Sequence, residues 1–182
     1  LLVDYTDMLC KFLVEGDVPK LDVMFVDEAQ DLSPLQWAVV RKLADKAKKI
    51  YVAGDDDQAI YKWAGADVDY LIQNSKDALV LKQSYRVPSA VHEVARQCIG
   101  QVRSRIYKEW TPRKEKGLVR WEPNIELVNM EKGDWLVLAR TNYLLEDVDD
   151  YCRNEGWFFE VKGRPSIPES KIRAVLYWEK LR

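Results

Sequence analysis

The sequence contains few of the residues that build cysteine- or histidine-based chemistry. It has three cysteines, Cys10, Cys98 and Cys152, which are widely spaced and form no CxxC pair, and one histidine, His92. The odd cysteine count indicates reduced thiols in a cytosol-like compartment and argues against a zinc site. His92 lies in a segment with a helical pattern, where we expect a surface or capping role. No Ser-His-Asp or Cys-His catalytic group is therefore expected.

Long apolar runs, low-complexity tracts and internal repeats are also missing. No apolar run reaches the roughly 18 residues that a membrane span needs, and no signal peptide is present. We therefore expect no contact with a membrane.

The 182 residues are 47% apolar and 32% charged, with a net charge of −2, which indicates a globular protein. Nucleic-acid-binding domains are often basic, so the overall balance argues mildly against that partner. Residues 102–117 are nevertheless rich in Lys and Arg. Such a stretch is typical of a solvated surface, and a polyanion-binding site is the alternative.

Hydrophobic periodicity predicts alternating helices and strands. Helices are expected at 2–16, 32–47, 67–75, 88–100, 142–156 and 168–182. Strands are expected at 21–28, 48–54, 78–83, 117–123, 134–140 and 157–163, and the first two are expected to be buried. In the second helix Ser33 is the expected N-cap and Pro34 the first helical residue. This order predicts an α/β fold with a parallel sheet flanked by helices, and a domain boundary near residues 83–88.

Acidic residues follow two of the predicted strands. Asp27 and Glu28 end the first, at the sheet edge where open α/β sheets bind ligands. One carboxylate can hold Mg²⁺ and the other can polarise a water that attacks a phosphate; solvated acids at the end of a core strand are the alternative. Asp55, Asp56 and Asp57 do not suit a two-metal site, because successive side chains diverge. The amide of Gln58 suits the sensing of a phosphate or its attacking water.

Three motifs carry a specific resemblance. "VDEAQD" (26–31), "GDDDQAIYKWAGA" (54–66) and "LKQSYR" (81–86) resemble, in order and spacing, motifs II, III and IV of superfamily 1 DNA helicases of the UvrD/Rep type. The stretch 135–163 is similar to the part of that family that follows motif IV.

The resemblance implies two RecA-like domains that clamp ATP between them. Residues 1–20 would be the helical end of an accessory, 1B-like segment. Residues 21–84 would form the C-terminal part of the first RecA-like domain, 1A, and residues 85–182 the N-terminal part of the second, 2A. The first and last residues lie within predicted helices, so we expect a piece of a larger protein.

The resemblance also implies roles for individual residues around ATP and Mg²⁺. Asp27 would bind Mg²⁺, Glu28 would activate water, and Gln58 would contact the γ-phosphate. Arg86 would reach the γ-phosphate like an arginine finger, and Tyr85 would stack on the adenine. Gln83 has a weaker claim as a contact on the hinge side.

On the nucleic-acid side, the resemblance places Tyr61, Lys62 and Trp63 against single-stranded DNA. Aromatic rings stack on any base, which suits a motor that moves along all sequences. The alternative for Trp63 is a place in the core. The family usually has Gly and Arg where this sequence has Lys62 and Ala64, and Asn in place of Ser84.

The implied function is that of an ATP-dependent DNA helicase with DNA repair or replication roles. It would move 3′ to 5′ on single-stranded DNA, unwind duplex DNA, and lie in the cytoplasm of a bacterial or phage-infected cell. The chain has no GxxxxGK[ST] phosphate loop, so we expect the 182 residues alone to be monomeric and inactive. The alternatives are the helicase part of a helicase–nuclease, and a non-catalytic helicase-like module that binds DNA or protein.

Overall fold

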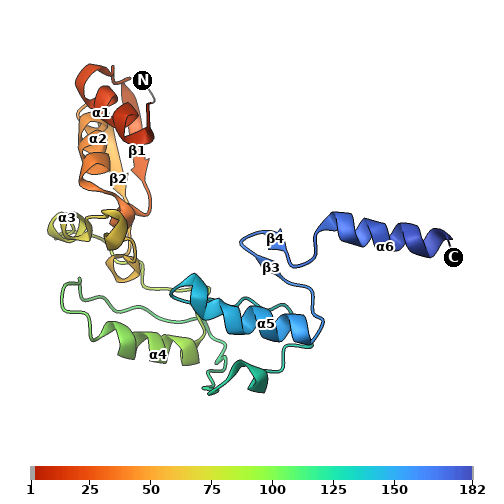
Figure 1. The fold of residues 1–182 in the computed structure, drawn as a ribbon. Coiled ribbons are helices and arrows are strands. Elements are labelled where there is room, and N and C mark those ends of the chain that lie inside the picture. The colour runs from red at the N-terminus through yellow and green to blue at the C-terminus, as the bar shows by residue number, and fades with distance from the viewer. Residues whose placement is uncertain (1–2, 182) are drawn as a thin grey trace. The chain divides into compact units, whose positions relative to one another are not determined.

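The computed structural model describes residues 3–181, which fall into two compact units, Leu1–Val119 and Arg120–Arg182 (Figure 1). The domain boundary predicted near residues 83–88 lies inside the first unit and stays a prediction about the complete protein. Residues 2 and 182, at the outer ends of two predicted helices, lie outside the described residues.

The first unit opens with two helices and two strands that alternate along the chain. These are α1 (Tyr5–Glu15), β1 (Leu21–Val26), α2 (Pro34–Ala44) and β2 (Ala47–Val52). Both helices begin with a capping box. Asp4 and Asp7 exchange side-chain-to-backbone hydrogen bonds at α1, and Ser33 and Gln36 do so at α2. These pairs satisfy N–H groups that a helix start leaves without partners. The predictions for Ser33 and Pro34 are confirmed.

Strands β1 and β2 pair in parallel, with Phe25 beside Tyr51. Side chains alternate between the faces of a strand, so Met24 is buried while Val23 and Phe25 are exposed. Val26, on the same face as Met24, packs against the core. One face of β1 is therefore covered in part, whereas Ile50, Tyr51 and Val52 of β2 are all exposed, so the prediction of a buried strand is wrong for β2.

The core lies where β1, α2 and helix α3 (Val68–Gln73) meet. Its fully buried members are Ala29, Trp37 and Leu71, and the partly buried residues packed around them are Val26, Leu32, Val40 and Tyr70. The rings of Trp37 and Tyr70 lie 4.5 Å apart. Because Ala29 follows β1 directly, this packing fixes the chain where the acidic residues leave the sheet.

Helix α4 (Ser89–Ile99) completes the helices of the first unit, as predicted. The strand predicted at 78–83 is wrong, because this segment forms only an isolated bridge between Gln83 and Thr111. Leu79 and Leu81 are 88% and 83% exposed. A strand needs a neighbour to pair its N–H and C=O groups, and no described strand lies beside residues 78–82.

The second unit is also mainly helical. Its regular elements are the 3-10 helices η4 (Ile125–Leu127) and η5 (Asn142–Leu145), helix α5 (Glu146–Asn154), strands β3 (Glu160–Val161) and β4 (Arg164–Pro165), and helix α6 (Glu169–Leu181). The two strands form a hairpin whose two loop residues, Lys162 and Gly163, have positive φ of 52° and 74°. Two successive positive φ values characterise the type I′ turn, which matches the twist of paired strands.

The strands predicted at 117–123 and 134–140 are wrong, and the one at 157–163 shrinks to Glu160–Val161. Their apolar side chains find no sheet to cover, and Leu136 and Leu138 are 81% and 80% exposed. The described residues thus form a mixed α/β structure with one small parallel sheet. No helix within residues 3–181 is long and apolar enough to span a membrane.

Candidate functional site

The candidate site begins where β1 ends, at Asp27 and Glu28. Both side chains are exposed. Glu28 has a left-handed backbone, with φ 51° and ψ 41°, which is uncommon for a residue other than glycine. Its backbone N–H donates a 2.9 Å hydrogen bond to Asp27 Oδ1. The chain therefore leaves the geometry of the strand at Glu28.

Gln30 joins the ends of the two strands. Its side chain is 1% exposed, and it is the one buried polar residue of the part that the structure describes. Its Nε2 donates a 2.6 Å hydrogen bond to Glu28 Oε2, and its Oε1 accepts one of 2.9 Å from the Asp55 backbone N–H. Sequence reasoning missed this residue. Its position in "EAQD", two residues after Glu28, is the only sequence signal for it.

The second strand leads into an acidic turn, residues 55–58, which contains the 3-10 helix η2 (Asp56–Gln58). Asp55 caps it by accepting from the Asp57 N–H at 3.2 Å, and also accepts a 2.6 Å hydrogen bond from Gln58 Nε2. A Cβ on Gly54 would lie 2.9 Å from a Leu71 methyl group and 3.0 Å from Gln30 Oε1. Glycine is therefore required for the close approach of the turn to the core.

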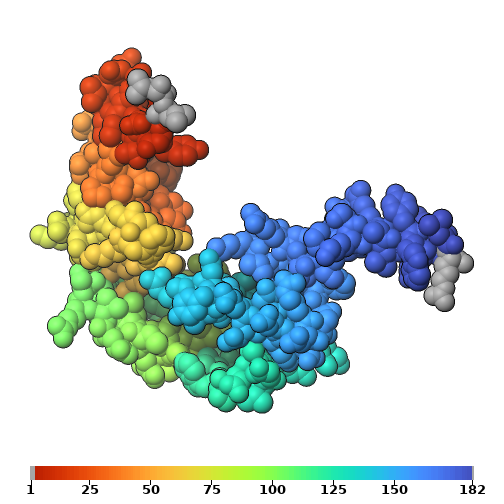
Figure 2. All heavy atoms as spheres, viewed as in Figure 1, coloured from red at the N-terminus to blue at the C-terminus, as the bar shows by residue number. Residues whose placement is uncertain are grey.

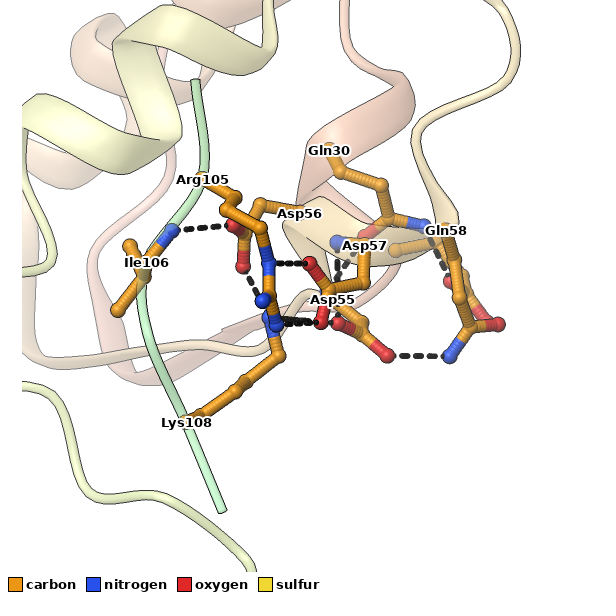
Figure 3. Close-up of polar contacts among 9 residues, drawn as sticks. Gln30, Asp55, Asp56, Asp57, Gln58, Arg105, Ile106 and Lys108 are labelled. Atoms are coloured by element: carbon orange, nitrogen blue, oxygen red, sulfur yellow. Dashed lines mark hydrogen bonds and ion pairs between the residues drawn. The ribbon is translucent and has the colours of Figure 1, made fainter. Parts of the chain in front are cut away.

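The acidic turn lies against residues from the basic segment. The ion cluster, as we call it, consists of Asp55, Asp56, Asp57, Arg105 and Lys108 (Figure 3). Lys108 Nζ lies 3.1, 2.5 and 3.0 Å from the three carboxylates in sequence order. Arg105 makes a bidentate pair with Asp57, with both distances 2.7 Å. The basic segment is thus no uniformly solvated surface, because two of its cations face inward.

The pKa values of Asp57, Lys108 and Arg105 are shifted within the cluster. Burial disfavours the ionised form of Asp57, but hydrogen bonds from Arg105 and Lys108 outweigh it, so the pKa of Asp57 lies below its ordinary value. Burial disfavours the charged form of Lys108, but hydrogen bonds to the carboxylates raise its pKa above the ordinary value. The hydrogen bond to Asp57 likewise raises the pKa of Arg105. All these groups therefore stay ionised at neutral pH.

Gln58 is held on one side and accessible on another. Its amide nitrogen donates to Asp55, yet the residue is exposed. It lines a cavity of about 820 Å³ whose other walls come from α4 and from residues 102–110. In the space-filling view, the yellow residues around α3 lie directly against the green residues around α4 (Figure 2). A ligand can therefore reach Gln58 without any change in the acidic turn.

The aromatic residues follow the acidic turn within a few positions. Tyr61 and Trp63 flank Lys62 in the 3-10 helix η3 (Lys62–Ala64), and their ring centroids lie 6.4 Å apart. Tyr61 is 45% and Trp63 75% exposed. A core position for Trp63, which the sequence left open, is excluded. A large exposed indole beside an exposed phenol and a lysine forms a surface on which a flat, anionic ligand can stack.

Tyr85 and Arg86 lie apart from these groups. Both are exposed. Within residues 3–181, no hydrogen bond or ion pair joins either of them to Asp27, Glu28 or Gln58. Their segment is held beside residues 111–113, where Gln83 Nε2 donates to the Thr111 and Pro112 carbonyls. The structure therefore brings together the residues of the first two motifs and does not add those of the third.

The described residues hold no group of three or more His, Cys, Asp or Glu side chains that could bind a metal ion by themselves. Among residues 3–181, Asp27 accepts a hydrogen bond only from the Glu28 N–H. Mg²⁺ is commonly bound by one or two carboxylates together with substrate phosphates. The donor set around Asp27 fits an ion of that kind and not a metal site built from protein side chains alone.

Comparison with known proteins supports the resemblance inferred from the motifs. Residues 9–78 match the model of the UvrD/REP helicase N-terminal domain. The chain is 27% identical over 175 residues, 84% of its length, to the ATP-dependent DNA helicase PcrA of Leuconostoc citreum. It is 36% identical over 110 residues to PcrA of Staphylococcus aureus and 33% over 102 residues to PcrA of Bacillus subtilis, matches that cover 58% and 53% of the chain.

These matches cover 23% of the Leuconostoc protein and 14% of each of the other two. The chain thus spans less than a quarter of the length of these relatives. The motifs after β1 and β2 lie inside the matched family domain, and the resemblance inferred from them is confirmed. The stretch from residue 9 to residue 78 therefore belongs to the UvrD/Rep helicase family.

Proposed function

We propose that this chain is the part of an ATP-dependent DNA helicase that connects the nucleotide site with the single-stranded DNA site. The complete protein would couple ATP hydrolysis to 3′–5′ movement on single-stranded DNA and to duplex unwinding. One observation supports this above all. A hydrogen-bonded chain from Glu28 through Gln30 and Asp55 reaches Gln58, and the exposed aromatic pair begins three residues later.

At the nucleotide end, Asp27 would hold Mg²⁺ together with the phosphates, and the ion would neutralise charge on the transferred phosphoryl group. Glu28, held by Gln30, would orient and deprotonate the attacking water. Gln58 would contact the γ-phosphate. Tyr85 and Arg86 would reach the nucleotide from a second RecA-like domain, which is where the proposal places residues 85–182.

At the DNA end, Tyr61 and Trp63 would stack on bases and Lys62 would contact a phosphate. Stacking tolerates every base because each has a π face. The aromatic pair is exposed in the absence of any ligand, so no rearrangement of the core is needed to bind a strand.

The test is single-stranded DNA binding by the 182-residue chain, measured by the anisotropy of a labelled oligothymidine. Trp63→Ala is expected to weaken binding by about 1–3 kcal/mol, roughly 5- to 150-fold. The matched control is Trp121→Ala, because Trp121 is 83% exposed but lies outside the motif; it should leave binding unchanged. Equal affinities of the three proteins would contradict the proposal.

A further inference from the structure

The ion pairs of Arg105 and Lys108 with the acidic turn join residues 48 to 53 positions apart in sequence, and most of the side chains in them are largely buried. The exposed fractions are 14% for the Lys108 side chain, 15% for Arg105, 13% for Asp57 and 4% for Asp56. Exposed ion pairs add little to stability because water and salt screen them. These pairs are shielded from water, so each charge depends on its partners.

The ion cluster has three carboxylates and only two cations, and backbone and amide donors supply what is missing. The Ile106 N–H donates a 2.6 Å hydrogen bond to Asp56, and the Asp57 N–H and Gln58 Nε2 both donate to Asp55 (Figure 3). Removing one partner of a buried pair leaves an uncompensated charge, which is strongly unfavourable. The conformation of the turn is therefore tied to the presence of the cations.

Asp55 transmits this constraint toward the candidate site. One carboxylate oxygen contacts Lys108, and the other accepts from Gln58. Its backbone N–H donates to Gln30, which in turn donates to Glu28. Lys108 is thus connected to Gln58 through Asp55 alone, and to Glu28 through Asp55 and Gln30.

From this geometry we propose that Arg105 and Lys108 are positioning residues: they clamp the acidic turn and thereby place Gln58, and they are not contacts for a polyanion. The idea that Gln58 is thereby placed toward a phosphate rests on the proposed function. The clamp, meaning the hold of Arg105 and Lys108 on the acidic turn, does not rest on it, because it consists of contacts within the chain.

The first test is backbone amide hydrogen exchange on the 182-residue chain. Lys108→Met keeps the aliphatic stem and removes the charge, so exchange at Asp55–Gln58 should rise about tenfold or more, while exchange in α2 stays unchanged. Lys108→Arg should restore most of the protection, since it keeps the charge. Lys114→Met is the matched control from the same basic segment, because Lys114 is exposed; it should change nothing.

The second measurement is the titration of Asp57 by NMR of its side-chain carboxyl carbon. Lys108→Met should raise the pKa of Asp57, whereas Lys108→Arg and Lys114→Met should leave it low. The groups that face Asp57 are the cations Arg105 and Lys108 and the neighbouring carboxylates of Asp55 and Asp56. If Lys108 only filled space, the pKa of Asp57 would not depend on whether residue 108 carries a charge.

Three results would overturn the clamp. The first is unchanged exchange at Asp55–Gln58 in Lys108→Met. The second is a rise of exchange in α2 equal to the rise in the acidic turn. The third is a loss of oligothymidine binding in Lys108→Met that exceeds the loss in Lys114→Met while the acidic turn stays protected. The last would make Lys108 a DNA contact. If exchange and titration follow the prediction but no variant of the chain binds DNA, the clamp stands and the proposed function fails.

Discussion

At the scale of single residues, Gln30 is the least replaceable polar side chain near the site. It is the only described residue that hydrogen-bonds groups from both strand ends, and it is 1% exposed. A buried donor or acceptor that loses its partner costs the full desolvation energy of that group. An amide has both a donor and an acceptor, so neither a carboxylate nor an apolar side chain can satisfy Glu28 and Asp55 together.

Gln30→Ala is expected to lower the free energy of unfolding by about 2 kcal/mol, because the Asp55 N–H loses its acceptor and a cavity forms. Urea unfolding followed by circular dichroism measures it. Gln73→Ala is the control, since Gln73 is an exposed residue of α3. A loss in Gln30→Ala no greater than that in the control would show that the bridge is not maintained in solution.

At the scale of elements, the helices of this chain could be predicted from the sequence and most of the strands could not. A helix satisfies most of its own backbone groups, and a capping residue can mark its first turn, as Ser33 does. A strand depends on a neighbour that the local pattern does not identify. Residues 21–26 and 48–52 pair with each other. Residues 78–83 and 134–140 have equally apolar patterns but no partner strand among the described residues.

Lys42, in α2, contacts the end of α1. Lys42 Nζ donates hydrogen bonds of 2.7 and 2.9 Å to the Phe12 and Leu13 carbonyls, at the end of α1, and lies 5.0 Å from the Phe12 ring centroid. The Phe12 carbonyl also accepts the Gly16 N–H. Carbonyls in the last turn of a helix lack a partner within the helix itself, and a cation interacts favourably with that end.

Lys42→Met should therefore destabilise the chain by about 1–2 kcal/mol, through loss of the charged hydrogen bonds and of the contact with the ring. Thermal unfolding measures this. Lys46→Met, at an exposed position just after α2, should leave the melting temperature almost unchanged. Equal melting temperatures of the two variants would mean that Lys42 does not hold α1 in place.

At the scale of the whole chain, contacts between distant segments could not be predicted from the sequence. The motifs identified Asp27, Glu28 and Gln58 because these lie next to strand ends. The basic segment could equally have been solvated or bound to a polyanion, since its pattern does not reveal that Arg105 and Lys108 face three carboxylates. The net charge of −2 gave no sign of this pairing, because it counts charges without their positions.

The ion cluster should make stability depend on pH in the acidic range. Asp57 has a lower pKa when folded than in an unfolded chain, so the folded state binds fewer protons and acid favours unfolding. The contribution is fully present above the unfolded-state pKa of about 3.9 and is lost as the pH falls through the lower, folded value. Urea unfolding between roughly pH 5 and pH 3 should show this fall.

Arg105→Gln should make that fall shallower, because it removes a group that holds the Asp57 pKa down. Arg103→Gln, at an exposed position of the same segment, should keep the wild-type slope. Identical slopes in all three proteins would contradict the pairing of Asp57 with Arg105.

The 182 residues should not turn over ATP, because no GxxxxGK[ST] loop is present to hold the phosphates. Phosphate release in the presence of Mg²⁺, ATP and single-stranded DNA measures it. Turnover that Glu28→Gln abolishes would show that this chain alone contains a working site, contrary to the proposal.

The most direct test of the account asks whether one turn connects the two proposed sites. Amide hydrogen exchange of the 182-residue chain is compared with and without a saturating oligothymidine. The account predicts slower exchange at residues 61–65, where the strand would stack, and an accompanying change at residues 55–58, with α1 and α2 unaffected. Protection confined to other parts of the chain, or none at residues 61–65 while the oligonucleotide is bound, would contradict it.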